Sequence, residues 1–498
     1  MKIISLKDNQ FQPVEWDAAW ISEKDGEKPS FEDPLKSKLE NISEKSIMDL
    51  ASSAEKGDKF IVFPSKSAKS DLDKSDNFIF KLTSRASFQT GNVMGFIGLG
   101  DDVQVQITSR FDDVKNEDGT AKNFFLHYML QKVCNVAFAP KTGSAEEQIF
   151  DFLYYLFPGY LKAACAQGIY RAYVTREYND SNVRGPIDVA RHIRYNMPFN
   201  GKIAYHTREY TTDNKITQLV RHTIEYIRTL KYGGAVLKAN NDVRDDVSDI
   251  IASTPSYSKG SRLQVISQNL RPVTHPYYTA YEPLRKLCLA ILLHKKLSYG
   301  MSDNRPITGI LFDGASLWEE YLAKVLKEHR SGLIHSNNRE KKNGVKLFVG
   351  GHDYYPDFYK KESADNAQDA VVFDAKYKRL CTVNGEVSDE TSDDSKENKN
   401  GVYFHYKLED LRQMLAYMHC LKAKKTVLIS PYRCADAKRE VLVPDEPKIA
   451  TGYGGEVTII AVPVPVYNSK TDWDDFKKEM EKIEDSLYAK VEGQILMS

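Results

Sequence analysis

The first 115 residues alternate between short apolar runs and polar turns, which predicts a small β-rich domain. In residues 103–109, Val103, Val105 and Ile107 alternate with glutamines, the period-two pattern of a strand with one buried face. Further strands are predicted over residues 59–64, 78–82 and 93–99. The charged, low-complexity residues 65–76 are interpreted as a solvated loop.

Residues 116–300 carry apolar residues at three- and four-residue spacing, which predicts a mostly helical middle region. The clearest amphipathic stripe lies in residues 213–232, and we interpret Asp213 as the cap of that helix. Its stripe consists of Ile216, Leu219, Val220, Thr223, Ile227 and Leu230, and other helices are predicted over 124–136, 148–166 and 278–297.

Residues 301–498 are interpreted as a separate α/β unit. A helix is predicted over 315–329, with Asp313 as its cap, and the chain then alternates between strands and helices. The strands are 345–349, 354–359, 370–376, 426–430 and 457–466, the helices 408–421 and from about 472, and a polar acidic loop spans 379–400. The predicted order is α-β-β-β-α-β-β-α.

Composition and charge fit a globular protein of several domains. At roughly 150 residues per domain, 498 residues suggest about three. The 69 Lys and Arg balance 69 Asp and Glu, which argues against a nucleic-acid binder coated in positive charge. Residues 171–231 nevertheless hold 11 basic against 6 acidic residues, whereas 386–397 hold six acids and one lysine. The basic segment could approach phosphates, with Arg184, Arg191 and Arg194 as candidate DNA-binding residues.

The six cysteines form no Cys-x-x-Cys pair, which argues against a zinc ribbon or a thioredoxin motif and fits a reducing compartment. The first residues lack the apolar core of a secretory signal, and no run approaches the ~20 apolar residues of a membrane span. We therefore expect a soluble, cytoplasmic protein. The chain also lacks a phosphate-binding P-loop, so it is not itself a P-loop motor.

The candidate chemistry lies around a buried strand that ends in charged residues. Asp374 and Lys376 follow the apolar run 370–373 and, two positions apart, point to the same face. Asp357 precedes Asp374 by 17 positions, directly after Pro356. Buried charges need compensation, and carboxylate pairs are typical ligands of Mg²⁺. Lys376 could then orient an attacking water or stabilise charge developing on a phosphate.

Two helices supply the remaining candidates. Glu319 lies near the edge of the apolar stripe of helix 315–329, which makes it our preferred additional ligand. Gln413 and Tyr417, four residues apart, share one face of helix 408–421, where they could contact phosphate or an active-site group. The opposite face, with Leu408, Leu411, Leu415 and Met418, is interpreted as the core side. Each of these three polar residues could instead be an ordinary exposed helical residue.

The order of these motifs resembles a known nuclease core. Pro356-Asp357, Asp374-Ala375-Lys376 and the Gln413-to-Tyr417 spacing are similar to the PD-(D/E)XK nucleases, and the last element is typical of the RecB-like branch. From about residue 90 to about 435 the chain resembles the McrC family, the nuclease subunit of McrBC modification-dependent restriction systems. The segments 95–109, 123–130, 182–188 and 209–214 carry that wider likeness.

The resemblance implies a fold, a reaction and a partner. The fold would be a multidomain α/β protein: residues 1–115 a β-rich partner-interaction domain, 116–300 a mostly helical region, and 301–498 a restriction-endonuclease-like domain. The reaction would be Mg²⁺-dependent hydrolysis of modified double-stranded DNA, with Asp357, Asp374 and Glu319 as metal ligands and Lys376 as the catalytic cation. The partner would be an McrB-like AAA+ GTPase ring.

Two points remain open at this stage. The gap between Asp357 and Asp374 is longer than the short hairpin usual in such nucleases, which leaves the register of the strands undecided. The alternative function is a catalytically inactive nuclease-fold adaptor that regulates a partner NTPase or binds nucleic acid. Convergence of Asp357, Asp374 and Lys376 in the folded chain would favour the enzyme.

Overall fold

The structure is a computed structural model of the whole chain. It describes residues 2–13, 21–22, 30–31, 43–44, 46, 60–63, 78–84, 87–99, 103–112, 122–136, 145–297, 309–329, 332–336, 342–346, 351, 353–361, 370–383, 402–435, 439–444, 449–450, 455–466 and 472–496. The predicted loop 65–76 and most of the acidic segment 379–400 lie outside these residues.

The chain forms two compact units. Unit 1 comprises Met1–Val133, Ala139–Ile149 and Ile307–Ser498, and unit 2 comprises Cys134–Phe138 and Phe150–Pro306. The first and last of the three predicted segments therefore fall in one compact unit. Most of the predicted helical segment forms the other unit.

The amino-terminal sheet of unit 1 explains this grouping. Its strand order is β1-β9-β8-β12-β5, and β12 (Gly309–Asp313) comes from far along the chain. β12 pairs antiparallel with β8 (Val93–Leu99) and parallel with β5 (Phe60–Phe63). All five residues of β12 are buried, and the strand lies between β8 and β5 inside the sheet. The sequence did not predict a strand there, and the boundary near residue 301 separates β12 from its sheet partners.

The other strands of this part agree well with the pattern of the sequence. β9 (Val103–Thr108) pairs with β8, as the predicted neighbouring strands 93–99 and 103–109 suggest, and β1 (Lys2–Lys7) pairs parallel with β9. Gly95 has φ +136°, and a Cβ there would collide with the carbonyl of Ile310 on β12. Shorter strands are β2 (Phe11–Pro13), β3 (Ile21–Ser22), β4 (Ser30–Phe31), β6 (Phe80–Ser84) and β7 (Ser87–Thr90).

The carboxy-terminal sheet of unit 1 has the order β13-β16-β17-β20-β22-β21. β16 (Phe358–Lys360) and β17 (Val371–Ala375) are antiparallel, whereas β17, β20 (Lys425–Cys434) and β22 (Glu456–Pro465) are parallel. These parallel strands are buried almost throughout, as expected for strands covered on both faces. The edge strands of this sheet are β13 (Ile334–His335) and β21 (Ile449–Ala450). Two further strand pairs lie outside it. One is β14 (Val345–Lys346) with β15 (Asp353–Tyr354), and the other is β18 (Cys381–Val383) with β19 (Val402–Phe404).

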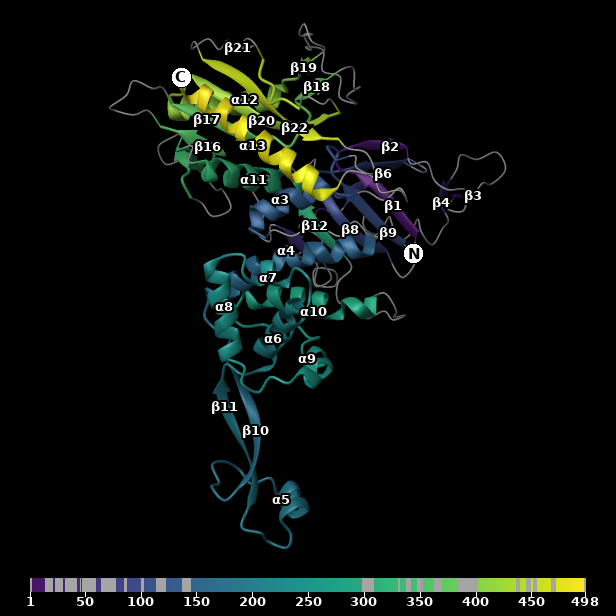
Figure 1. Ribbon diagram of the computed structural model, residues 1–498, viewed down its shortest axis with the longest axis vertical. Coiled ribbons are helices and arrows are strands. Elements are labelled where there is room, and N and C mark those ends of the chain that lie inside the picture. The colour runs from purple at the N-terminus through teal and green to yellow at the C-terminus, as the bar shows by residue number, and fades with distance from the viewer. Residues whose placement is uncertain are drawn as a thin grey trace. The chain divides into compact units, whose positions relative to one another are not determined.

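Helices precede, interrupt and follow this sheet, as predicted. α11 (Gly314–Glu328) begins at Asp313, whose carboxylate accepts bonds from the amides of Ala315 and Ser316, so the predicted cap is confirmed. α12 (Leu408–Leu421) has the predicted bounds and connects β19 to β20. α13 (Trp473–Leu496) packs along β22 (Figure 1). α3 (Phe124–Cys134) joins this packing, because buried Glu484 of α13 accepts bonds from Tyr128 and Tyr321.

Three predictions in this part need correction. The predicted strand 354–359 is two short strands, β15 and β16, with a break at residues 355–357; the Asp357 carbonyl still accepts a bond from the amide of Ser336. The start of the predicted loop 379–400 is a strand, β18. The predicted core face of α12 is correct only in part: Met418 is buried and Leu411 packs against the core, whereas Leu408 and Leu415 are exposed. Asp410, Met414 and Tyr417 are buried instead.

Unit 2 is a helical body that carries a long hairpin. β10 (Ala172–Asp180) and β11 (Ile203–Thr211) pair along their whole length and extend away from the helices, with α5 (Val189–Asn196) between them (Figure 1). The body comprises most of α4 (Ala145–Cys165) together with α6 (Lys215–Arg228), α7 (Gly233–Leu237), α8 (Asn241–Ala252), α9 (Arg262–Gln268) and α10 (Tyr281–Leu297). None of the described helices is both long and apolar enough to cross a membrane.

Candidate active site

The register of β16 against β17 brings Asp357 to Asp374. Phe358 pairs with Phe373, so one further antiparallel step places Asp357 opposite Asp374. Asp357 Oδ2 accepts a bond from the amide of Ala375 at 2.6 Å, which holds its carboxylate at the end of β17. The long connection between the two acids therefore leaves the pairing of their strands regular.

Lys376 lies at the same end of β17 and contacts polar groups from two elements. Its ammonium lies 2.7 Å from Asp374 Oδ2 and donates to Gln413 Oε1 at 2.7 Å. Asp410 Oδ1 is 3.7 Å away. The side chain of Lys376 is mostly buried and that of Asp374 almost completely so, which strengthens their electrostatic interaction. The amide of Lys376 bonds to the carbonyl of Ile429 on β20, which fixes the backbone at this point.

One face of α12 supplies the groups around Lys376. Asp410, Gln413 and Tyr417 follow one another at three- and four-residue spacing, so they lie on the same face. Gln413 Nε2 donates to Tyr417 Oη at 2.8 Å, and Tyr417 Oη donates to the carbonyl of Tyr355 at 3.4 Å. This face turns toward the sheet because its polar groups have partners there. For that reason the apolar stripe of the helix predicted only part of the buried face.

Glu319 lies close to the two aspartates but bonds elsewhere. Its carboxylate is 3.1 Å from His335 Nε2, and the His335 ring stacks on Phe358 with centroids 5.1 Å apart. The negative charge of Glu319 contributes to raised pKa values of both Asp357 and Asp374. Glu319 is therefore part of the same electrostatic environment, although its carboxylate contacts His335.

The pKa values in this cluster reflect the crowding of several carboxyl groups around one lysine. Loss of water raises the pKa of Asp357 well above its ordinary value, and the charges of Asp374 and Glu319 raise it further. Burial also raises the pKa of Asp374, although Lys376 opposes this effect. The pKa of Lys376 is raised because the surrounding aspartates outweigh the effect of burial. Several perturbed pKa values at one strand end are typical of functional sites.

The chemistry of the donors fits a divalent cation, whereas their arrangement is not a finished ligand shell. Carboxylate oxygens are the ligands that Mg²⁺ prefers, often only one or two of them with water. The repulsion between Asp357 and Asp374 would be relieved by added positive charge. Within the described residues, however, no group of three or more His, Cys, Asp or Glu side chains is arranged to hold a metal ion.

Three residues of this cluster were not predicted from the sequence. Asp410 accepts from Lys378 Nζ at 2.9 Å, and its position three residues before Gln413 is a signal that could have identified it. Lys378 continues the alternation of Lys376 and is partly exposed. His335 comes from a short edge strand, and no sequence pattern connects it to Glu319.

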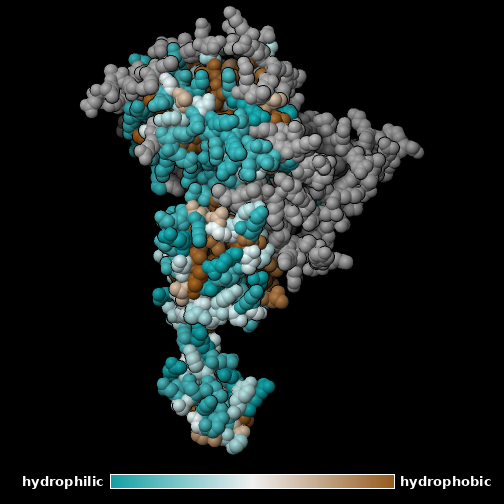
Figure 2. Space-filling model, in the orientation of Figure 1, coloured by the Kyte–Doolittle hydropathy of each residue, from teal (hydrophilic) through white to brown (hydrophobic). Residues whose placement is uncertain are grey.

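The three predicted DNA-binding arginines all lie on the hairpin of unit 2, where each has a local partner. Arg184 donates to Tyr205 Oη at 3.2 Å and covers the Tyr178 ring. Arg191 lies 3.4 Å from Glu177, and Arg194 lies over the ring of Tyr195. Hydrophilic residues predominate on the visible face of the hairpin (Figure 2). Each arginine thus has a local contact within unit 2, and its role in DNA binding stays a prediction.

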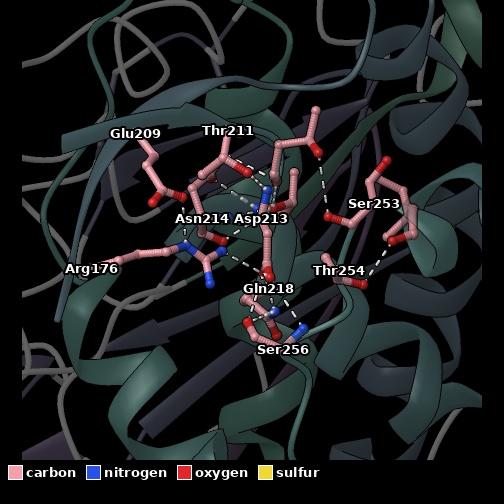
Figure 3. A network of polar contacts seen from close by, with 12 residues as sticks. Arg176, Glu209, Thr211, Asp213, Asn214, Gln218, Ser253, Thr254 and Ser256 are labelled. Atoms are coloured by element: carbon pink, nitrogen blue, oxygen red, sulfur yellow. Dashed lines mark hydrogen bonds and ion pairs between the residues drawn. The ribbon is translucent and has the colours of Figure 1, made fainter. Parts of the chain in front are cut away.

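The base of the hairpin is held by a polar network around Asp213 (Figure 3). Asp213 accepts from Gln218 Nε2 at 2.5 Å, from the Ser256 hydroxyl at 2.9 Å and from Arg176 at 3.3 Å. The helix cap is Asn214, which accepts from the amides of Ile216 and Thr217 in a capping box. The prediction that Asp213 caps α6 is therefore wrong. The capping residue is the next one along the chain.

Comparison with known proteins places the chain in a family. The family model of the McrBC 5-methylcytosine restriction system component matches residues 88–431, more than half of the chain. The chain belongs to this family. All of the site residues described above fall within the matched range, as does most of unit 2. The resemblance to the McrC family noted from the sequence is confirmed.

Two solved structures also resemble this chain. One is a refined half-complex from a tetradecameric assembly of Thermococcus gammatolerans McrB AAA+ hexamers with bound McrC, with 14% identity, a TM-score of 0.42, and coverage of 97% of this chain and 100% of that chain. The other is the Thermococcus gammatolerans McrBC complex, with 14% identity, a TM-score of 0.31, and coverage of 66% and 88%. No curated protein matches the chain.

Proposed function

We propose that this chain is the nuclease subunit of an McrBC-type restriction system and hydrolyses DNA with Mg²⁺. The proposal rests above all on the contact of 2.7 Å between Lys376 and Asp374 at the strand end where Asp357 also lies. The order of α11, three antiparallel strands, α12 and a parallel strand agrees with the PD-(D/E)XK core that the motifs resemble.

Each residue of the cluster has a chemical role in this proposal. Asp357 and Asp374 would hold the cation, with Glu319 as a further ligand once it leaves His335. A bound Mg²⁺ would lower the pKa of a water and neutralise phosphate charge. Lys376 would then be released toward the phosphate, where its charge stabilises the negative charge that develops during attack.

The α12 residues would position this lysine. Gln413 binds Lys376 directly and is itself oriented by Tyr417, whose hydroxyl bonds to the Tyr355 carbonyl. Asp410 lies near Lys376 and binds Lys378, so it would keep both lysine side chains at the end of β17, where the DNA phosphate is proposed to bind. We further propose an McrB-like AAA+ GTPase as the partner, on the basis of family membership.

The test compares Asp374→Asn with the matched control Asp353→Asn. Asp353 lies on β15, is exposed and belongs to the segment that leads to Asp357. Cleavage of methylated plasmid with the partner GTPase, GTP and Mg²⁺ should fall by about a thousandfold in Asp374→Asn and stay within about twofold in Asp353→Asn. Binding of the partner and stimulation of its GTPase should be unchanged in both variants.

Metal binding gives a second readout. Calorimetric titration with Ca²⁺ should show binding to the wild-type chain and the Asp353→Asn variant, and none to Asp374→Asn. Undiminished cleavage by purified Asp374→Asn would contradict the nuclease assignment. Together with normal stimulation of the partner, it would favour the alternative of an inactive adaptor.

A further inference from the structure

The side chain next to the candidate catalytic lysine is bound by the amino-terminal sheet. Tyr377 leaves the end of β17 and is buried, with its ring packed against Phe111 at 5.2 Å and 73°. Its hydroxyl lies 2.7 Å from the hydroxyl of Ser109, a residue 268 positions earlier in the chain. Ser109 follows the last residue of β9. A side chain from one sheet of unit 1 is thus inserted into the end of the other.

Arg110 contacts Tyr377 from a second direction. We call the set of residues around the Tyr377 side chain its socket. Its guanidinium donates to the carbonyl of Tyr377 and lies over the Tyr377 ring at 5.0 Å. Arg110 is itself fixed, because its amide donates to Asp8 Oδ1 at 2.5 Å and its side chain lies 3.5 Å from Asp8 Oδ2. Both members of this ion pair are buried, so the arrangement tolerates little displacement.

The first turn of α11 forms the third side of the socket. A Cβ on Gly314 would lie 2.7 Å from the Tyr377 ring, so glycine is required for the ring to fit. The amide of Gly314 donates to the carbonyl of Asn92, at the start of β8. α11 also carries Glu319, so the socket fixes two elements of the candidate site at once.

We propose that Ser109, Arg110 and Tyr377 are positioning residues for Lys376, so that the amino-terminal sheet completes the nuclease centre. This inference rests on the proposed nuclease function. The amide of Lys376 donates to the Ile429 carbonyl, and the next residue, Tyr377, is held by Ser109 directly after β9. A shift at the end of β9 would therefore move the lysine. The region that the sequence suggested as a separate partner-interaction domain would be part of the catalytic unit.

The test removes single hydroxyl groups, which should leave the fold intact. Tyr377→Phe and Ser109→Ala each break the bond between the two hydroxyls and retain the ring. Ser109→Ala also removes the acceptor of the Phe111 amide at 3.2 Å, and Tyr377→Phe the weak contact with the Met94 sulfur at 3.5 Å. Tyr432→Phe is the matched control, since Tyr432 is also buried in unit 1 but donates to the carbonyl of Glu440. Cleavage by the complex with the GTPase should show kcat lowered by about fivefold in each test variant, with KM within about twofold.

A double variant distinguishes a direct link from two separate effects. If the hydroxyls act on each other, Ser109→Ala combined with Tyr377→Phe should lose clearly less than the product of the two single losses, because the shared bond is counted in both single variants. A loss of about 25-fold, the product of two independent fivefold effects, would overturn the proposal. So would kcat values equal to those of Tyr432→Phe.

Hydrogen exchange gives a readout that does not depend on nuclease activity. The amide of Lys376 is protected by its bond to Ile429. Exchange over residues 370–383 should be about fivefold faster in Tyr377→Phe and Ser109→Ala than in Tyr432→Phe. If the wild-type chain does not cleave DNA, the nuclease proposal fails, whereas exchange still decides whether the socket positions Lys376. Unchanged exchange would overturn the inference in either case.

Discussion

Asp213 and Asp357 are both poorly accessible acids in segments that resemble motifs of one family, yet their surroundings differ fundamentally. Asp213 in unit 2 receives bonds from Gln218, from Ser256 and from Arg176. Although burial opposes it, these donors lower the pKa of Asp213. Asp357 in unit 1 faces Asp374 and Glu319, and its pKa is raised well above the ordinary value.

The difference separates a structural acid from a candidate functional one. A carboxylate surrounded by donors is stable in its charged form and contributes to the fold. A carboxylate among other acids is an unfavourable arrangement for the apo fold, and such arrangements are typical of sites that bind a cation or transfer a proton. Substitution of Asp213 should therefore lower the stability of its unit, whereas substitution of Asp357 should raise it.

The largest effect on stability is expected for Asp213→Ala. The change leaves Arg176 and Gln218 without their shared acceptor, so unit 2 should lose about 2–4 kcal/mol of stability. Hydrogen exchange over β10, β11 and α6 would measure the loss. Glu225→Ala removes the ion pairs of Glu225 with Arg221 and Arg228 on the same helix. It should lower stability by no more than about 1 kcal/mol. Equal losses in the two variants would contradict the structural role of Asp213.

The sequence predicted the regular parts of this fold well. Val93–Leu99 and Leu408–Leu421 have the predicted bounds because alternation and helical periodicity are local properties. β12 was not predicted, because a five-residue apolar run carries no period and its partners lie more than 200 positions earlier. The buried face of α12 was predicted only in part, because the burial of Asp410 depends on Lys376 and Lys378, which follow β17.

The candidate site was predicted to a similar extent. Asp357, Asp374, Lys376, Gln413 and Tyr417 meet in the structure because their order follows strand ends and one helix face. His335 and Tyr377 depend on pairing between distant elements, which no local pattern encodes. The hydrogen-bond donors that separate Asp213 from Asp357 likewise come from tertiary packing.

A smaller effect, of opposite sign, is expected for Asp357→Asn. The amide oxygen of asparagine can still accept from Ala375, while the repulsion from Asp374 and Glu319 disappears. Unit 1 should therefore gain about 1 kcal/mol at neutral pH in the presence of EDTA, even though cleavage is lost. Denaturant unfolding would measure the gain, with Asp353→Asn as the neutral control. A loss of stability would make Asp357 a structural acid like Asp213.

The smallest expected effect is the pH dependence of the stability that Asp213 contributes. Its folded-state pKa lies below the unfolded value of about 3.9, so its contribution is fully present above that pH and is lost as the pH falls through the folded pKa. Asp213→Asn has no such titration. Hydrogen exchange would measure this effect. The difference between the wild-type chain and Asp213→Asn in exchange protection of β10 and α6 should shrink as the pH falls from about 5 to about 3. A difference that stayed constant over this range would mean that the charge of Asp213 does not stabilise the base of the hairpin, and only its shape and hydrogen bonds would distinguish it from Asp357.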